Sequence, residues 1–256
     1  MTKLRPRDAR WYGWLPDLPD HRDYRYAAIR RRRARLPRKV DLRAMCSAVE
    51  NQGDLGSCTA NALVGALEFL ENKQGRAVRN LSRLFVYYNE RALEGTVDED
   101  SGAFLRDGIK TLVKLGVCEE TQWPYVISRY RKKPTAACFS AAKKHQLLTY
   151  HRLDTLADMR SCLADGYPFV FGFTVYTAFE SAKVEKTGVL NMPTRSEEDR
   201  GGHAVLAVGY DDATKRVLVR NSWGASWGMR GYFTMPYAYV SSRDLADDFW
   251  TVRAFE

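Results

Sequence analysis

Residues 52 to 58 read Gln-Gly-Asp-Leu-Gly-Ser-Cys, and an apolar run with helical spacing begins at Cys58 itself. This order places a thiol in the first turn of a predicted helix, with Ser57 as its N-cap, where the helix dipole favours the thiolate. A lone cysteine on an apolar face is more often a structural core residue, so that alternative stays open for Cys58 taken alone. Gln52, however, has no evident structural task there. The stretch predicts a cysteine nucleophile with an amide donor nearby.

A second candidate pair, His203 and Asn221, lies in the C-terminal half of the chain. Each belongs to one of two alternating apolar runs, and a polar turn centred on Asp212 joins the runs. In such a hairpin His203 faces Asn221 with Cβ atoms roughly 5 Å apart, unless the register slips by one or two residues. An imidazole opposite an amide oxygen suits a base that is oriented to serve a nucleophile. The other three histidines have no comparable partner: His21, His145 and His151.

Periodicity divides the elements that must position these residues into two kinds. Apolar side chains at helical spacing predict helices over 58–71, 82–93 and 104–115. Short β-prone segments predominate after residue 125, with one short helix over 156–163. The predicted strands are 146–153, 169–175, 204–210, 216–220, 231–236 and 249–255. A helical half followed by a β half predicts an α+β fold with the ligand cleft between the two halves.

The net charge of +9 is confined to the N-terminal segment. The first 40 residues carry 13 Lys/Arg and 4 Asp/Glu, so the rest of the chain is neutral. A charge run of this kind is typical of a solvated stretch and argues against nucleic acid as a partner. The run Arg30–Arg33 favours a connector over a processing site. Aromatic residues punctuated by Gly and Pro over Trp11–Pro19 predict an extended strand that lies on a surface.

The five cysteines bear on metal binding and on the cellular compartment: Cys46, Cys58, Cys118, Cys138 and Cys162. They form no CxxC pair, which argues against a zinc site, and we expect neither a metal nor another cofactor. Their odd number favours reduced thiols, although one disulfide that excludes Cys58 stays open. No segment has the roughly 18 apolar residues of a membrane span, and the N-terminus lacks the apolar core of a secretory signal. We therefore expect a cytoplasmic protein, or one exported by a route without a cleavable signal peptide.

Three motifs occur in the order cysteine, histidine, asparagine. They are Gln52-Gly53 with Gly56-Ser57-Cys58, Gly202-His203-Ala204-Val205, and Asn221-Ser222-Trp223-Gly224 followed by Trp227-Gly228 and Gly231-Tyr232. Together they resemble the papain family of cysteine peptidases (C1), in which His and Asn follow the Cys by roughly 130–150 residues. The resemblance spans most of the chain from Val40 onward. It is closest to a bacterial-type branch with a short N-terminal segment.

The resemblance implies a two-lobed papain-like fold with the active site in the cleft between the lobes. Residues 39–145 would form a mainly helical lobe that carries the nucleophile. Residues 146–256 would form an antiparallel, β-barrel-like lobe that carries His203 and Asn221. Residues 1–38 would be a basic segment, either a short pro-segment or an arm that modulates access to the cleft.

The resemblance also implies a role for each matching residue. The Cys58 thiolate would attack the substrate, the His203 imidazolium would protonate the leaving amine, and Asn221 would orient the imidazole. The Gln52 amide and the Cys58 backbone N–H would form the oxyanion hole. The residues implied to contact a peptide or protein substrate, or to shield the catalytic pair from water, are Ser101, Gly102, Gly202 and Trp223. The implied enzyme is a cysteine-type peptidase, expected to be an endopeptidase, that works through a thioester acyl-enzyme.

Two positions depart from the family pattern and leave other functions open. Leu55 stands where the family usually has a cysteine, and Thr59 replaces the usual aromatic residue after the nucleophile. A related Cys-His amidase or transglutaminase-like enzyme would also place its cysteine at a helix N-terminus, but it would usually use a carboxylate where this chain has Asn221. A catalytically silent papain-like binding protein, whose arginine-rich arm contacts an acidic partner, is the alternative outside enzymes. Neither the oligomeric state nor the cleavage-site preference follows from the sequence.

Overall fold

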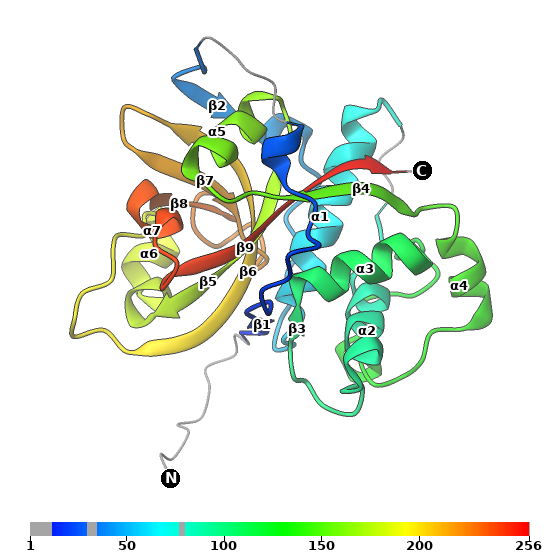
Figure 1. Cartoon of the computed structure of the whole chain (residues 1–256). Coiled ribbons are helices and arrows are strands. Elements are labelled where there is room, and N and C mark those ends of the chain that lie inside the picture. The colour runs from blue at the N-terminus through cyan, green and yellow to red at the C-terminus, as the bar shows by residue number, and fades with distance from the viewer. Residues whose placement is uncertain (1–11, 30–34, 77–79, 256) are drawn as a thin grey trace.

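A sheet of long strands and a group of helices lie against each other in the computed structural model, which describes residues 12–29, 35–76 and 80–255 (Figure 1). The run Arg30–Arg33 lies outside these residues. The helices of the N-terminal half of the chain occupy the right-hand side of Figure 1, and the sheet occupies the left and centre with the short helices of the C-terminal half beside it. The expected α+β, two-lobed papain-like architecture is confirmed. The proposed limits of the three chain segments, 1–38, 39–145 and 146–256, stay a prediction.

Seven strands of the described part of the chain form one antiparallel sheet. Their order is β4-β9-β5-β6-β7-β8, and β2 pairs with the far end of β6. The bounds are Lys39–Asp41 for β2, Leu147–Arg152 for β4, Phe169–Tyr176 for β5, Asp199–Asp211 for β6, Arg216–Arg220 for β7, Tyr232–Pro236 for β8 and Ala246–Phe255 for β9. Six of these strands match predicted ones, while the short β2 was not predicted. The central strand β5 is apolar on both faces because each face is covered.

The three long predicted helices are present within one or two residues of their expected bounds. They are α1 (Cys58–Lys73), α2 (Arg83–Glu94) and α3 (Leu105–Leu115). The helix α5 (Leu156–Ala164) was also predicted, whereas α4 (Ala136–Ala142), α6 (Ala182–Thr187) and α7 (Tyr237–Ser241) were not. All three unpredicted helices are too short to show two full turns of apolar periodicity.

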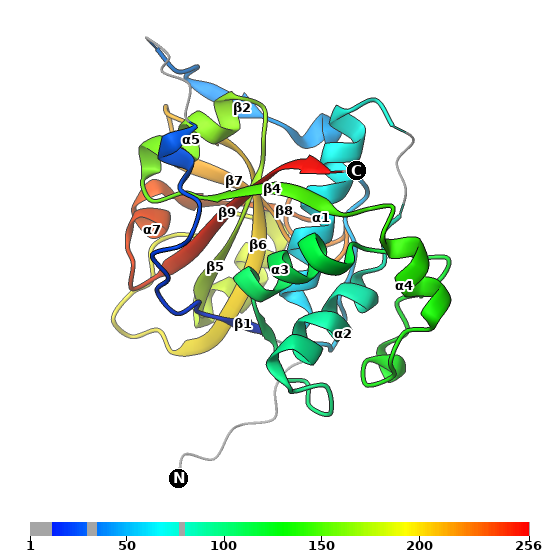
Figure 2. The same cartoon turned by 45° about the vertical axis from the view of Figure 1, so that its right-hand side comes forward.

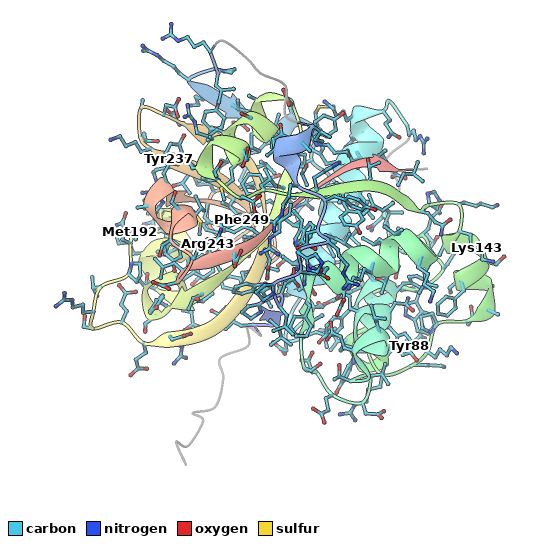
Figure 3. All side chains as sticks on the ribbon, in the orientation of Figure 1. Tyr88, Lys143, Met192, Tyr237, Arg243 and Phe249 are labelled. Carbon is cyan, nitrogen blue, oxygen red and sulfur yellow. The ribbon has the colours of Figure 1, made fainter. Side chains whose placement is uncertain are left out.

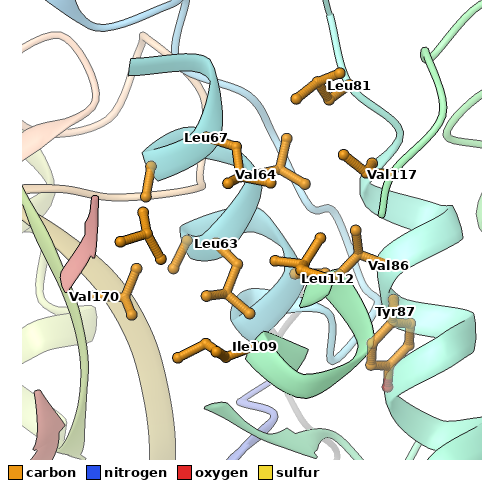
Figure 4. Packing of buried hydrophobic residues seen from close by; sticks show 14 of the residues in the cluster. Leu63, Val64, Leu67, Leu81, Val86, Tyr87, Ile109, Leu112, Val117 and Val170 are labelled. Carbon is orange, nitrogen blue, oxygen red and sulfur yellow. The ribbon is translucent and has the colours of Figure 1, made fainter. Parts of the chain in front are cut away.

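Helix α1 is buried along nearly its whole length because it lies between the sheet and the helices α2 and α3 (Figure 2). Leu63 of α1 lies beside Ile109 and Leu112 of α3, as Figure 4 shows, and Val170 of β5 lies on the other side of α1. A second apolar cluster fills the far side of the sheet around the aromatic side chains of β5. Polar and partly exposed side chains cover the outer rim, with Lys143 and Met192 at opposite edges (Figure 3). The helix that begins at Cys58 is therefore held rigidly by both halves.

The hairpin β6–β7 forms as expected, but its predicted register is wrong. Leu206 pairs with Arg220, and His203 finds its strand partner in Phe173 of β5 rather than in Asn221. The turn is longer than a tight turn on Asp212, and the register shifts again between Ala207 and Gly209. At that irregularity β6 also pairs with β2, and a Cβ on Gly209 would lie 2.3 Å from the Val40 carbonyl oxygen. The register already departs from the predicted one beside the turn, where Asp211 pairs with Arg216.

The N-terminal aromatic stretch is extended, as predicted, and Gly13, Trp14 and Asp17 within it are buried, whereas Leu18 and both of its prolines are exposed. Residues Trp14–Leu15 form strand β1, which pairs in parallel with β3 (Ala103–Phe104). Figure 1 shows this segment in blue, running upward between the sheet and the helices. Trp14 is only 7% exposed. We call residues 12–23 the strap.

A buried carboxyl group behind the nucleophile couples the stability of the fold to pH. Glu90 of α2 is fully buried, its Oε2 accepts a hydrogen bond from the Thr59 hydroxyl (2.8 Å), and burial raises its pKa to about 8. Its folded-state pKa lies above its ordinary value near 4.5, so its stabilising effect is complete below pH 4.5 and is lost as the pH rises toward 8. We expect Glu90→Gln to remove up to about 1.4 kcal/mol per pH unit of this dependence.

Urea unfolding of both proteins between pH 5 and pH 9 measures this effect. The control is Glu99→Gln, which makes the same substitution at an exposed position. Parallel curves for wild type and Glu90→Gln would show that Glu90 is not the titrating group.

Candidate active site

Cys58 is the first residue of α1, and its thiol is completely buried. Burial raises the pKa of the thiol to about 11, although backbone N–H groups of Ala204, Gly13 and Thr59 act in the opposite direction by stabilising the thiolate. Ser57 occupies the N-cap position, but its hydroxyl makes no capping bond and instead lies 2.6 Å from the Tyr125 hydroxyl. The donors of the first helical turn are thus not consumed by a side-chain cap. In the structure as it stands the thiol is uncharged at neutral pH.

His203 and Asn221 meet through a hydrogen bond of 2.8 Å between His203 Nε2 and Asn221 Oδ1. The same Asn221 oxygen accepts the backbone N–H of Ser222 at 2.9 Å, and a backbone N–H can only donate. That contact identifies the atom as oxygen, so Nε2 of His203 carries the proton and Nδ1 is the basic nitrogen. Nδ1 is buried and has no hydrogen-bond partner among the described residues. The imidazole is therefore held in a single tautomer with one nitrogen available for proton transfer.

Aromatic rings enclose the His203–Asn221 pair. The Trp223 ring lies 5.2 Å from the His203 ring, and Phe179 lies 5.0 Å from Trp223. Burial among these groups lowers the pKa of His203 to about 4, while the hydrogen bond from its ring to Asn221 acts in the opposite direction. The predicted shielding position of Trp223 agrees with this arrangement. Phe179, which sits in an unremarkable stretch of the sequence, was missed.

Gln52 links the approach to the nucleophile with the loop that carries Asn221. Its Nε2 donates to the Leu55 carbonyl (2.9 Å), which also accepts the backbone N–H of Ser57 (2.8 Å). Its Oε1 accepts the Ser222 hydroxyl (2.5 Å), and its own backbone N–H donates to the Ser222 carbonyl (2.9 Å). These bonds define the direction of the amide. No role was predicted for Ser222 from the sequence. Its position directly after Asn221 in the asparagine motif was the signal that could have indicated one.

The two glycines predicted to contact substrate lie against the strap in this structure. A Cβ on Gly102 would lie 2.1 Å from the Gly13 carbonyl oxygen, and a Cβ on Gly202 would lie 2.4 Å from the Trp14 carbonyl oxygen. The neighbouring Ala103 N–H donates to Gly13 O at 2.7 Å. Ser101 is half-buried and its hydroxyl donates to Thr96 at 2.9 Å. Gly102 and Gly202 thus lie against the backbone of the strap at Gly13 and Trp14, and Ser101 is the neighbour of Gly102 in the chain.

The strap passes directly over the nucleophile. The Gly13 backbone approaches the Cys58 thiol, and a Cβ on Gly13 would lie 1.8 Å from the Gly56 carbonyl oxygen. Tyr12 packs its ring 5.8 Å from the His203 ring, and its hydroxyl donates to Glu180 (2.7 Å). Residue 13 must therefore be glycine for the strap to dock in this way, and nothing in the local sequence indicated that requirement.

Ion pairs and hydrogen bonds anchor the far end of the strap to the body. Arg106 of α3 pairs with Asp23 (2.8 Å) and donates to the Leu18 carbonyl (2.6 Å). The Asp17 carboxylate accepts the indole N–H of Trp250 (3.1 Å), and the Asp17 backbone N–H donates to Asp248 (2.8 Å). The strap is thus fixed at both ends of the region that covers Cys58.

Other functional possibilities leave no trace in the part of the chain that the structure describes. Within it, no group of three His, Cys, Asp or Glu side chains is arranged to hold a metal ion. All five cysteines are free thiols, so no disulfide forms among them. No described helix combines the length and the apolarity that crossing a bilayer requires.

Comparison with known proteins provides independent evidence on the family of this chain. The family described as papain family cysteine protease matches residues 36–248. A peptidase C1-like protein of Acanthamoeba polyphaga mimivirus is 47% identical over 213 residues, which cover 79% of this chain and 68% of that protein. Pro-cathepsin H of Mus musculus is 29% identical over 73% of this chain and 55% of its own length. Pro-cathepsin H and three further relatives, from Entamoeba histolytica, Fasciola hepatica and Carica papaya, are matched over 55% to 62% of their own length.

Among solved structures, xylellain, a cysteine protease from Xylella fastidiosa, is 42% identical, with a TM-score of 0.88 and 99% of each chain covered. The bromelain protease from Ananas comosus, solved with the E64 inhibitor, shares the fold at 24% identity and a TM-score of 0.66, over 84% of this chain and 98% of that one. Sequence and structure agree over the region that holds Cys58, His203 and Asn221. The chain therefore belongs to the papain family of cysteine proteases.

Proposed function

We propose that this protein hydrolyses peptide bonds through a Cys58–His203 pair, and that the strap holds the enzyme in a latent form. The observation that carries the proposal is the single tautomer of His203, which Asn221 fixes so that Nδ1 is the base. Peptides or proteins are the substrate class, and no cofactor takes part. The division into a basic N-terminal segment, a helical lobe and a β-rich lobe belongs to the same proposal.

The mechanism follows from the protonation states. The thiol of Cys58 transfers its proton to Nδ1 of His203, and the sulfur attacks the carbonyl carbon of the scissile peptide bond. The negative charge on the carbonyl oxygen is stabilised by the Cys58 backbone N–H and the Gln52 side-chain amide. His203 then returns the proton to the leaving amine, the C–N bond breaks, and a thioester remains on Cys58. His203 then deprotonates a water molecule, whose oxygen attacks the thioester carbon. The C–S bond breaks, the acid is released, and the proton on His203 returns to the Cys58 sulfur.

The latent state follows from the burial of Cys58 and His203. With the strap in place the pKa of Cys58 is near 11 and that of His203 near 4, so the neutral pair is strongly favoured over thiolate and imidazolium. Water that enters after the strap leaves would lower the thiol pKa and raise the imidazole pKa, because hydration favours both charged forms. The strap also occupies the space between Gly102 and Gly202 that a peptide substrate would need. The same segment therefore blocks access and suppresses the nucleophile.

A Gly13→Ala variant, in which the new methyl group cannot fit beside Gly56, provides the protein for the test. We expect it to digest a peptide library, and we expect the double variant Gly13→Ala/Cys58→Ala to leave the library intact. Rapid iodoacetamide labelling should fall on Cys58 rather than on the other four cysteines and should be lost in Gly13→Ala/His203→Ala. Equal, slow labelling of all five cysteines would contradict a Cys58–His203 peptidase and favour a silent binding protein.

A further inference from the structure

The indole of Trp14 fills a recess formed by three neighbouring strands of the sheet. A Cβ on Gly172 of β5 would lie 1.9 Å from Cε2 of the indole, and a Cβ on Gly202 of β6 would lie 2.7 Å from its Cε3. Asp248 of β9 accepts the indole N–H at 3.0 Å. We call the space bounded by Gly172, Gly202 and Asp248 the indole recess.

The two glycines give the indole recess its depth. Gly172 pairs with Ala204, and Gly202 stands two residues before Ala204 on the same strand, so both glycines face the same side of the sheet. A methyl group at either position would overlap the ring of Trp14. Glycine in the interior of a strand weakens the strand unless another group approaches closely, and here that group is a flat side chain. The recess is therefore shaped to admit a planar aromatic ring.

Asp248 supplies the polar contact at the wall of the indole recess. Its carboxylate is completely buried, and its Oδ1 accepts Arg152 at 3.2 Å. Its Oδ2 accepts two donors, the Trp14 indole N–H and the Asp17 backbone N–H, and both donors belong to the strap. When the strap leaves, this oxygen loses both hydrogen bonds and faces the water that enters the recess. A substrate side chain that fills the recess displaces this water, so one that donates a hydrogen bond to the oxygen is favoured over one that leaves the oxygen buried without a donor.

The charges left behind favour a neutral donor over a cationic one. Asp17 and Asp23 leave with the strap, whereas Arg106 and Arg152 stay on the body opposite Asp247 and Asp248. The remaining groups balance in charge. An indole N–H adds a hydrogen bond without adding a charge to this balance.

We propose that the indole recess is a specificity pocket of the peptidase and that Asp248 makes it select a substrate side chain that is planar and carries an N–H donor, namely tryptophan. This inference rests on the proposed function, because it assigns a preference to that same site. Trp14 is the strap residue next to Gly13, which lies against Cys58, so a substrate side chain in the recess is held close to the bond that is cut. The strap thus resembles a bound substrate in the contact that matters most for selection.

Fluorogenic peptides that differ at one residue test the proposal on full-length Gly13→Ala protein. Each position near the cut carries in turn tryptophan, phenylalanine or 3-benzothienylalanine, in which sulfur replaces the indole N–H while the ring shape is kept. We expect kcat/KM to be at least about 10-fold higher for tryptophan than for the benzothienyl peptide at one position, since a site built around a hydrogen bond rejects the analogue that lacks it.

Gly172→Ala supplies the matched variant. Its methyl group displaces Trp14 and also fills the recess, so we expect an active protein that has lost the preference for tryptophan. If Gly13→Ala cleaves tryptophan and benzothienyl peptides equally at every position, the pocket assignment is overturned while the peptidase function stands. If Gly13→Ala cleaves no more than Gly13→Ala/Cys58→Ala, the proposed function fails and the pocket assignment fails with it.

Discussion

Gly13→Ala should raise peptidase activity about 10- to 100-fold over wild type. A Cβ at position 13 would lie 1.8 Å from the Gly56 carbonyl oxygen, and because that oxygen is backbone it cannot rotate away. Overpacking of this kind costs typically 1–3 kcal/mol, which converts to roughly 5- to 150-fold in the docking equilibrium of the strap. The change lies on the strap itself, so it leaves the catalytic residues untouched. Initial rates on a mixed peptide library, with far-ultraviolet circular dichroism as a check on folding, measure the effect.

The pH dependence of thiol alkylation separates strap release from other causes of activation. Docking of the strap buries Cys58 and raises its pKa to about 11, so iodoacetamide should react with the wild-type thiol mainly at strongly alkaline pH. In Gly13→Ala the thiol is hydrated, and the midpoint of the rate profile should move to lower pH. Leu18→Ala is the control, because Leu18 is a strap residue that is 77% exposed. Unchanged rates and an unchanged alkylation profile in a folded Gly13→Ala protein would show that the strap does not limit access.

Gln52→Ala should lower kcat about 100- to 1000-fold in the Gly13→Ala background, with little change in KM. An oxyanion donor acts on charge that develops only in the transition state, so its loss appears in kcat rather than in binding. Ser222→Ala should cause a smaller loss, because Ser222 donates to the Gln52 oxygen and thereby directs the amide without touching substrate. Steady-state kinetics on one good peptide measures both variants.

The buried setting of Gln52 requires a control for structural damage. Gln122, an exposed glutamine, should tolerate the change to alanine with no loss of kcat. Thermal unfolding of the Gln52→Ala protein shows whether the packing around Leu55 and Ser222 survives. A loss that falls on KM alone, or a loss no greater than that of Ser222→Ala, would remove Gln52 from the oxyanion hole.

Local sequence patterns were enough to predict the long helices and most of the strands. Helical spacing set the start of α1 at Cys58, because a 16-residue helix with an apolar face repeats its signal over several turns. Strand alternation likewise located β5 and β7. The pairing of His203 with Asn221 was anticipated, and yet the register that was used to argue it was wrong, since the strands join through a longer turn in which Asp211 pairs with Arg216. The side chains still meet because Asn221 lies just beyond the end of β7.

The sequence by itself was enough to predict the fold class and to propose the chemistry at Cys58, His203, Asn221 and Gln52, since those motifs depend on neighbours within a few residues. Only the tertiary structure decided where the N-terminal aromatic stretch lies and what it covers. Its contacts join residues such as Trp14 and Asp248, which are more than 230 positions apart. No local propensity encodes such a contact, because it exists only after the sheet, the helices and the strap have packed together.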